Sequence, residues 1–345
     1  MVAESKIKKT SEEIKNAILN SLKEGPKTIT EISEFINSNW ITVEEYLKKL
    51  KEEREVVEIV SSPKMKVYRR MDDLAFYGLP FSKEIREDTF ALLCLIAKMW
   101  RENNGKNPPR TILQKVAVEF VEEFRNDFRC PILNFHYGKT LALRYDQKFE
   151  NECKKLKITQ EQKKSLLGLI EEYKDWSSSE AKEKQYKKEG MEFYKTKEEL
   201  LDLFSSDKDE EITRKILELS VYYPSELSET YELFDKFEYC SINILNINKK
   251  DMKKEYIQKL KEIFSLVWDV ITTNAFFHEA EKYIEEDRKE LFNYIKNNTM
   301  NSKISNVSPI LEDLKSEIDS LPLENINLET SDKSKELLNR LLNGL

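Results

Sequence analysis

Residues 10–70 alternate between helix-type and strand-type patterns in a fixed order, and this order constrains the fold more than any other feature. The first segment begins with Thr10 and Glu13, which fit a capping box. Apolar residues then recur at helical spacing up to Leu22, and Gly25-Pro26 ends the helix. The sequence therefore predicts one amphipathic helix followed by a sharp change of chain direction.

A short strand and a second helix are predicted next. Thr28-Ile29 can form the strand, and Thr30 is expected to cap the helix. The buried face of this helix is predicted to be Ile32, Phe35 and Ile36. Asn and Ser side chains bond back to their own backbone, so residues 37–39 predict a tight turn.

A third helix and a two-stranded hairpin complete this region. Thr42 and Glu45 fit a second capping box, with Ile41 and Tyr46 spaced for a hydrophobic staple. The inward face is predicted to hold Val43, Tyr46, Leu47 and Leu50. Residues 56–60 and 66–68 are β-branched or aromatic runs joined by Ser61-Ser62-Pro63, which predicts a hairpin.

This order of elements resembles the winged helix-turn-helix superfamily, and within it the MarR-like and ArsR-like regulators. The resemblance rests on TITEISEFINSNWITVEEYLKKLKEEREVVEIV and KMKVYRR, about a fifth of the chain. It implies that helix 42–54 enters the major groove of DNA and that wing 61–70 touches nearby phosphates. Carried onto this sequence, the implied DNA contacts are Thr30, Ser38, Asn39, Trp40, Thr42, Glu45, Lys48, Lys49, Lys64, Lys66, Arg69 and Arg70.

Acidic residues at the start of the third helix are unusual for a helix that reads base edges, which more often carries Arg, Lys, Asn, Gln, Ser or Thr. Glu44–Lys48 and Glu45–Lys49 are spaced to stabilise the helix, and acids suit the positive end of a helix dipole. Glutamate can also accept a hydrogen bond from cytosine. These acids move the expected contacts toward Ser38–Trp40, Lys48-Lys49 and the wing.

Charge is distributed unevenly along the chain. The 345 residues carry a net charge of −7, yet residues 1–70 hold 14 Lys/Arg against 12 Asp/Glu, while the remainder holds 43 against 52. A mildly basic N-terminal unit on an acidic body excludes a general nucleic-acid binder but is compatible with a regulator. The abundance of Lys, Glu, Ile and Asn indicates an AT-rich genome, as in thermophilic archaea.

The remaining sequence predicts an all-helical body, so the fold class is mostly α. Only 7 Gly and 9 Pro occur, while 35% of residues are charged. The sequence does not decide between a short hairpin and a helix for segment 131–145. Long helices are predicted at 250–272 and 274–297, and a new helix from Ser308-Pro309. The predicted divisions are 1–71 (winged helix), 72–82 (linker), 83–175 (helical domain), 176–209 (charged connector), 210–299 (helical domain) and 300–345 (C-terminal helices and loops).

Signals for catalysis are absent or incomplete. Gly138-Lys139-Thr140 matches the end of a phosphate-binding loop, but Leu133 stands where its first glycine belongs. The four cysteines are scattered and only His136 and His278 occur, so no zinc site is predicted, and a reducing cytoplasm is expected. We expect no catalytic residues, no cofactor and no metal. The longest apolar run, Phe90–Ala97, is too short to span a bilayer, so no membrane association is expected.

The sequence thus predicts a cytoplasmic, non-enzymatic transcriptional regulator that binds duplex DNA as a homodimer. Its helical body would dimerise or bind an effector. The alternative is a winged-helix scaffold that binds protein within a nucleic-acid-processing complex. A last helix at 333–343, with leucines on one face, can either dock on the body or bind a protein partner.

Overall fold

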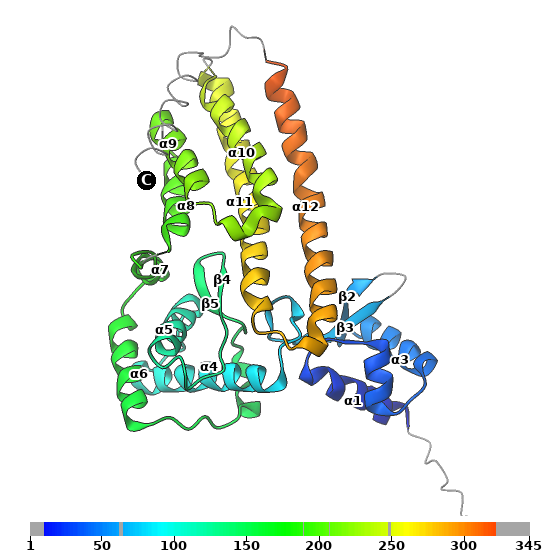
Figure 1. Ribbon diagram of the computed structural model, residues 1–345. Coiled ribbons are helices and arrows are strands. Elements are labelled where there is room, and N and C mark those ends of the chain that lie inside the picture. Colours follow the sequence, from blue (N-terminus) through cyan, green and yellow to red (C-terminus); the bar gives the residue numbers. More distant parts are fainter. Residues whose placement is uncertain (1–9, 62–64, 189, 207, 248–249, 322–345) are drawn as a thin grey trace, which may run out of the picture.

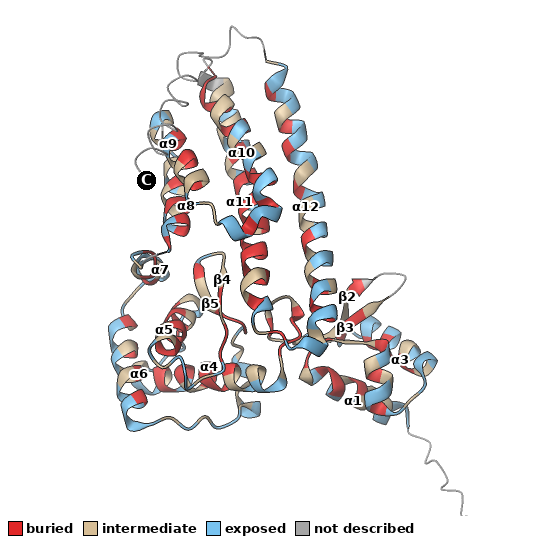
Figure 2. Ribbon diagram, in the orientation of Figure 1, coloured by how far each residue is buried: buried red, intermediate tan, exposed pale blue. Residues whose placement is uncertain are grey.

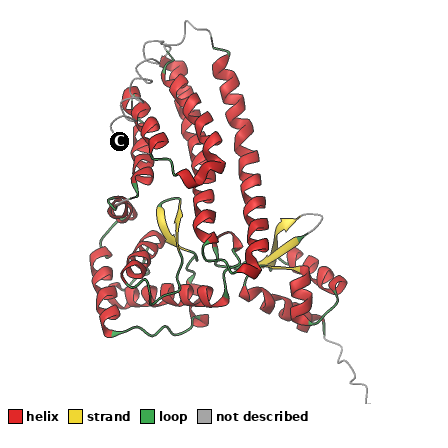
Figure 3. Ribbon diagram, viewed as in Figure 1, coloured by secondary structure: helices red, strands yellow, loops and turns green. Residues whose placement is uncertain are grey.

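The computed structural model describes residues 10–61, 65–188, 190–206, 208–247 and 250–321. It is mostly helical, as predicted (Figure 1). Among the described residues, strands occur only in the N-terminal unit and in one hairpin of the body, so the prediction of an all-helical body is wrong (Figure 3). We call residues 10–71 the head and residues 72–321 the body. The predicted helix at 333–343 lies outside the described residues.

The head combines three helices with a three-stranded antiparallel sheet in the order β1-β3-β2. Lys27 of β1 pairs with Tyr68 of β3, so the sheet joins the first strand to the hairpin. Its elements are α1 (Ser11–Ser21), a 3-10 turn (Leu22–Glu24), β1 (Lys27–Thr28), α2 (Ile29–Ile36), α3 (Trp40–Glu52), β2 (Val56–Ser61) and β3 (Lys66–Arg70).

The head has its own small hydrophobic core. One buried row on each helix packs together with the sheet, as the helical spacing predicted, and Thr10 with Glu13 forms the predicted capping box. Phe35, however, is exposed rather than buried. The core residues are Ile18, Leu22, Ile29, Ile32, Ile36, Val43, Leu47, Leu50, Val56 and Tyr68.

The body begins with a helical layer beside the β4–β5 hairpin (Figure 1). Segment 131–145, for which the sequence left a hairpin and a helix as alternatives, contains this hairpin. In it Leu133 pairs with Thr140. The elements are a 3-10 turn (Phe76–Gly78), α4 (Lys83–Asn104), α5 (Arg110–Glu123), β4 (Ile132–Phe135), β5 (Gly138–Leu141), a 3-10 turn (Gln147–Glu152) and α6 (Gln160–Tyr173).

The second part of the body is a group of helices in which α10, α11 and α12 pack against one another. Their buried rows merge with those of the first layer into one hydrophobic core (Figure 2). The elements are α7 (Ser178–Tyr186), α8 (Glu192–Leu203), α9 (Asp209–Val221), a 3-10 turn (Ser225–Thr230), α10 (Tyr231–Leu245), α11 (Lys250–Glu281), a 3-10 turn (Glu286–Arg288) and α12 (Lys289–Asp319). No described helix is both long and apolar enough to cross a bilayer.

Two segments predicted as connectors are packed instead. In the expected linker 72–82, Leu79 and Phe81 are buried in the main core. The expected connector 176–209 forms α7 and α8, which bury Phe193 and Tyr194. Charge density misled the prediction because many of these charges are paired, as in the ion pair between Lys182 and Glu198.

Two predicted helix boundaries are also wrong. α11 continues past residue 273, and within it Thr272 and Thr273 donate to the carbonyls of Trp268 and Asp269. α12 continues through Pro309, so no helix begins there. Its row Val307, Leu311, Leu314 and Ile318 is buried, and this packing outweighs the proline.

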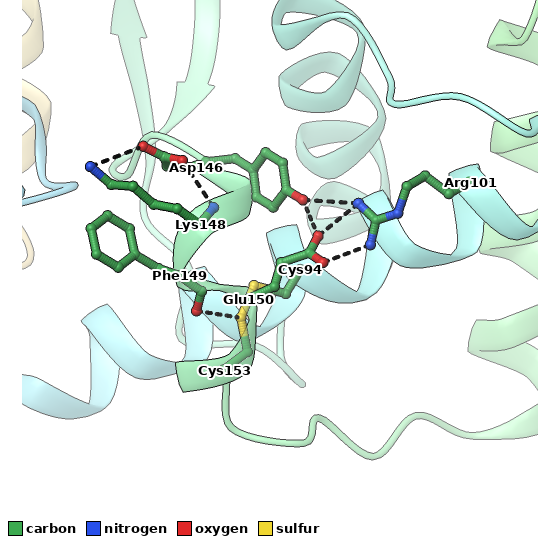
Figure 4. The surroundings of a disulfide bond; sticks show 8 residues. Cys94, Arg101, Asp146, Lys148, Phe149, Glu150 and Cys153 are labelled. Carbon is green, nitrogen blue, oxygen red and sulfur yellow. Dashed lines mark hydrogen bonds and ion pairs between the residues drawn. A yellow bond between two sulfur atoms is a disulfide. The ribbon is translucent and has the colours of Figure 1, made fainter.

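Cys94 of α4 and Cys153 are joined by a disulfide across a sequence separation of 59 residues (Figure 4). Beside it, both guanidinium nitrogens of Arg101 bind the Glu150 carboxylate at 2.7 Å, so the 147–152 turn is held to α4 at two points. Cys130 and Cys240 are buried thiols. The scattered spacing of the four cysteines in the sequence did not predict this pair.

Candidate nucleic-acid interface

The first turn of α3 is fixed by Asn39. Its side-chain oxygen accepts a hydrogen bond from the Thr42 amide at 2.7 Å, so Asn39 is the N-cap and the helix begins at Trp40. The capping box predicted for Thr42 and Glu45 is therefore wrong, and the helix spans residues 40–52 rather than 42–54. The sequence predicts Asn39 as a turn residue and a DNA contact, and its role as a cap was missed although Asn is among the strongest N-caps.

The start of α2 is also shifted from its predicted position. Thr28, not Thr30, is the N-cap and forms a capping box with Glu31. Thr30 consequently lies on the exposed surface of the first turn, where it remains available to a partner. Asn37 takes the left-handed conformation, with a φ of 49°, and turns the chain from α2 into α3.

The outward face of α3 carries mixed charges. Val43, Leu47 and Leu50 face the core, while Glu45, Lys48 and Lys49 are exposed. Among described residues, Lys48 forms no ion pair, and Lys49 lies 4.9 Å from the centre of the Tyr46 ring. In Figure 1, α3 lies on the side of the head away from the body. Both lysines can therefore reach a partner without moving the body.

Three large apolar side chains surround the turn between α2 and α3, a grouping that was not predicted from the sequence. Phe35 is 53% exposed, Trp40 45% and Ile41 67%. Ile41 cannot form the predicted staple because it is inside the helix rather than before its cap. Ser38 is half-buried beside these residues. The spacing of Phe35 could have predicted its exposure had the helix start been placed at Ile29.

The cationic side chains of the hairpin are largely engaged. Lys64 lies outside the described residues. Lys66 pairs with Glu44 of α3 at 2.9 Å, and this carboxylate raises the pKa of Lys66. Arg70 pairs with Asp72. The described part of the β2–β3 hairpin thus presents less free positive charge than the sequence indicated.

Arg69 points into the junction between head and body. A Cβ placed on Gly78, which has a φ of 64°, would lie 2.5 Å from Cδ of Arg69. Burial lowers the pKa of this arginine. Gly78 therefore leaves the space that Arg69 fills, and Arg69 is not an exposed residue of the β2–β3 hairpin.

Other contacts with the body also avoid α3. Arg288 donates to the Pro26 carbonyl at 2.7 Å and pairs with Glu31. The Asn298 amide of α12 donates to the Ile59 carbonyl at 3.0 Å. The head is thus held by the start of α2 and by β2, and its third helix stays uncovered.

Lys139 and Thr140, which match the end of a phosphate-binding loop in the sequence, have structural partners. Lys139 pairs with Glu122 at 2.6 Å and Thr140 donates to Gln114 at 3.0 Å, both from strand β5. Because no helix follows these residues directly, they do not form a phosphate-binding loop. Within the described part of the chain, no group of three or more His, Cys, Asp or Glu side chains could hold a metal ion. Comparison with protein families, curated proteins and solved structures finds no match.

Proposed function

We propose that the head is a winged helix-turn-helix that binds duplex DNA through the exposed face of α3. The observation that carries this proposal is the head's element order with the sheet order β1-β3-β2, combined with a third helix that the body leaves uncovered. In helix-turn-helix proteins the recognition helix enters the major groove. As a transcriptional regulator, the protein would dimerise through its body and present two heads about 34 Å apart to two half-sites.

The proposed contact surface is narrower than the sequence alone indicated. It comprises the turn residue Ser38, the first-turn residues Trp40, Ile41 and Thr42 of α3, the exposed Thr30 of α2, and the α3 lysines Lys48 and Lys49. Apolar side chains can contact thymine methyl groups, and hydroxyls can bond to base edges or phosphates. Arg69 and Arg70 are excluded from this surface, because Arg69 is partly buried at the junction with the body and Arg70 pairs with Asp72.

The affinity of such a head for DNA should depend only weakly on the salt concentration. Each phosphate that the protein neutralises releases counterions and adds about −0.9 to the slope of log affinity against log salt concentration. With Lys48 and Lys49 as the main free cations of α3, we expect a slope of roughly −2 for each head. A slope several times steeper would contradict this contact set.

The test is fluorescence anisotropy of labelled duplex fragments at low salt. Lys48→Ala with Lys49→Ala should weaken binding to all sequences and flatten the salt dependence. Lys163→Ala with Lys164→Ala is the matched control, because these adjacent lysines are exposed on α6 and change the charge equally. Equal affinity of the two double variants would refute DNA binding through α3.

A second candidate is a head that binds a protein partner, and the exposed Phe35, Trp40 and Ile41 favour it. Aromatic residues are enriched in interface cores. Trp40→Ala with Ile41→Ser should then abolish capture of a co-purifying protein, while the lysine double variant retains it. Duplex DNA should not bind the wild-type protein at low salt in that case.

A further inference from the structure

A cavity of about 530 Å³ lies in the body, away from the exposed face of α3. It is formed by the end of α5, the following turn, the β4–β5 hairpin, the start of α4 and the end of α11. Its apolar wall includes Val121, Phe128 and Ile132. This volume falls in the range of small-molecule sites, and more than half of the lining residues are polar or charged.

The acidic groups that line this cavity are neutralised by neighbouring lysines. Glu122 pairs with Lys139 at 2.6 Å and with Lys188 at 2.8 Å. Burial alone would raise the pKa of Glu122, but the two lysines outweigh it and hold the pKa below its ordinary value. Both oxygens of Glu279 accept hydrogen bonds from Lys282, at 2.9 and 2.8 Å.

Two arginines of the lining have no such partner. Arg125 and Arg129, on the turn between α5 and β4, form no side-chain ion pair or hydrogen bond with another described residue. The side chains of Asn134 and Tyr283, which also line the cavity, likewise form no hydrogen bond within the described chain. Both arginines are exposed, so the cavity combines an apolar wall with two solvent-accessible cationic side chains that no described residue pairs.

We propose that this cavity binds a small organic anion with an apolar body. A carboxylate, sulfonate or phosphate group would pair with Arg125 and Arg129, because the guanidinium fork matches such groups geometrically. The apolar body would lie against Val121, Phe128 and Ile132. This assignment does not depend on what the head binds.

The cavity lining includes residues next to two body segments that lie near the head. Its lining residue Ile85 precedes Arg86. Arg86 pairs at 2.7 Å with Asp73, which follows the head closely in the sequence. Tyr283, also in the lining, lies on the turn that leads to Arg288 and its contact with Glu31. A ligand in the cavity would thus touch both segments.

The test compares two fluorescent probes that differ in charge. The anionic 8-anilinonaphthalene-1-sulfonate should bind more tightly than its neutral analogue N-phenyl-1-naphthylamine. Arg125→Ala with Arg129→Ala should weaken the anionic probe at least roughly tenfold, which corresponds to about 1.4 kcal/mol, and change the neutral probe little. Lys106→Ala with Arg110→Ala is the matched control, because both residues are exposed and the two substitutions remove the same charge.

Photolabelling localises the probe independently of these variants. The photoreactive dimer of the anionic probe should label peptides from residues 121–135 in the wild-type protein. Unchanged anionic binding in the Arg125/Arg129 variant, equal loss in both double variants, or labelling confined to other peptides would overturn the proposal.

Discussion

Glu31 of α2 and Arg288 at the start of α12 form an ion pair that joins the head to the body. The same carboxylate accepts hydrogen bonds from the backbone and hydroxyl of Thr28, at 2.7 and 2.9 Å, and so closes the cap of α2. One side chain therefore contributes both to the cap of the second helix and to the attachment of the head.

Arg288→Ala should loosen this attachment without unfolding either part. The pair is partly buried and Arg288 also donates to Pro26, so we expect a loss of about 1 kcal/mol in local stability. Hydrogen exchange should accelerate for amides of residues 27–36. Lys282→Ala, which removes an ion pair with Glu279 at the end of α11, is the control and should leave this segment unchanged. Unaltered exchange in both variants would contradict the proposed attachment.

Trp40 should report directly on the partner of the head. Trp100 and Trp268 are buried, Trp176 is half-buried and Trp40 is 45% exposed, so acrylamide should quench Trp40 most strongly. Duplex DNA that covers the first turn of α3 should reduce this quenching. Trp40→Phe should remove the DNA-dependent part of the signal. DNA protection that persists in Trp40→Phe would place the contact elsewhere.

The Cys94–Cys153 disulfide should stabilise the body measurably. Closing a loop of 59 residues restricts the unfolded chain, and such bonds are worth about 2–4 kcal/mol. Dithiothreitol should lower the urea midpoint of the wild-type protein and leave Cys94→Ser with Cys153→Ser unchanged. Thiol titration in denaturant should find two free thiols before reduction and four after it. Four thiols before reduction would contradict the bond.

Lys115 should make stability depend on pH above neutrality. Burial, with smaller contributions from Lys182 and Lys188, lowers its pKa to about 7, while its ammonium donates to the carbonyls of Tyr137 and Lys139 at 2.6 and 3.0 Å. Between pH 7 and about 10, the unfolded chain retains a proton that the native state has released. Raising the pH in this window therefore favours the native state.

Lys115→Met should flatten this rise in the free energy of unfolding, measured by urea titration at pH 7, 8 and 9. Lys163→Met, at an exposed position of α6, is the control and should retain the wild-type slope. If the Lys115→Met variant keeps the wild-type slope, the Lys115 amine of the wild-type protein does not titrate in this range.

Local chemistry predicted the head better than the body. Apolar spacing located the buried rows of α1, α2 and α3 because this small core depends on neighbouring segments. The errors arose where two residues could serve the same purpose: Thr28 rather than Thr30, and Asn39 rather than Thr42, supplied the caps. Those shifts of two or three residues also changed which side chains are exposed, as Phe35 and Ile41 show.

Long-range packing explains what the sequence could not predict. Pro309 lies inside α12 because a buried row on both sides of it packs against the neighbouring helices. The engagement of Arg69 depends on Gly78 and on the body's approach, neither of which is visible in the periodicity of β3. The cavity arginines, Arg125 and Arg129, carry no motif and are brought to the cavity by a turn.

The continuity of α12 has a mechanical consequence. Its 31 residues extend about 46 Å. Asn298 contacts the head in the first part of the helix, and Asp319 at its other end accepts a hydrogen bond from Tyr239 of α10 at 2.7 Å. A stiff rod of this length converts a tilt of a few degrees at the head into a shift of several ångströms at its far end. Because α12 also packs against α10 and α11, such a tilt would carry their shared core with it and so couple movement of the head to these helices.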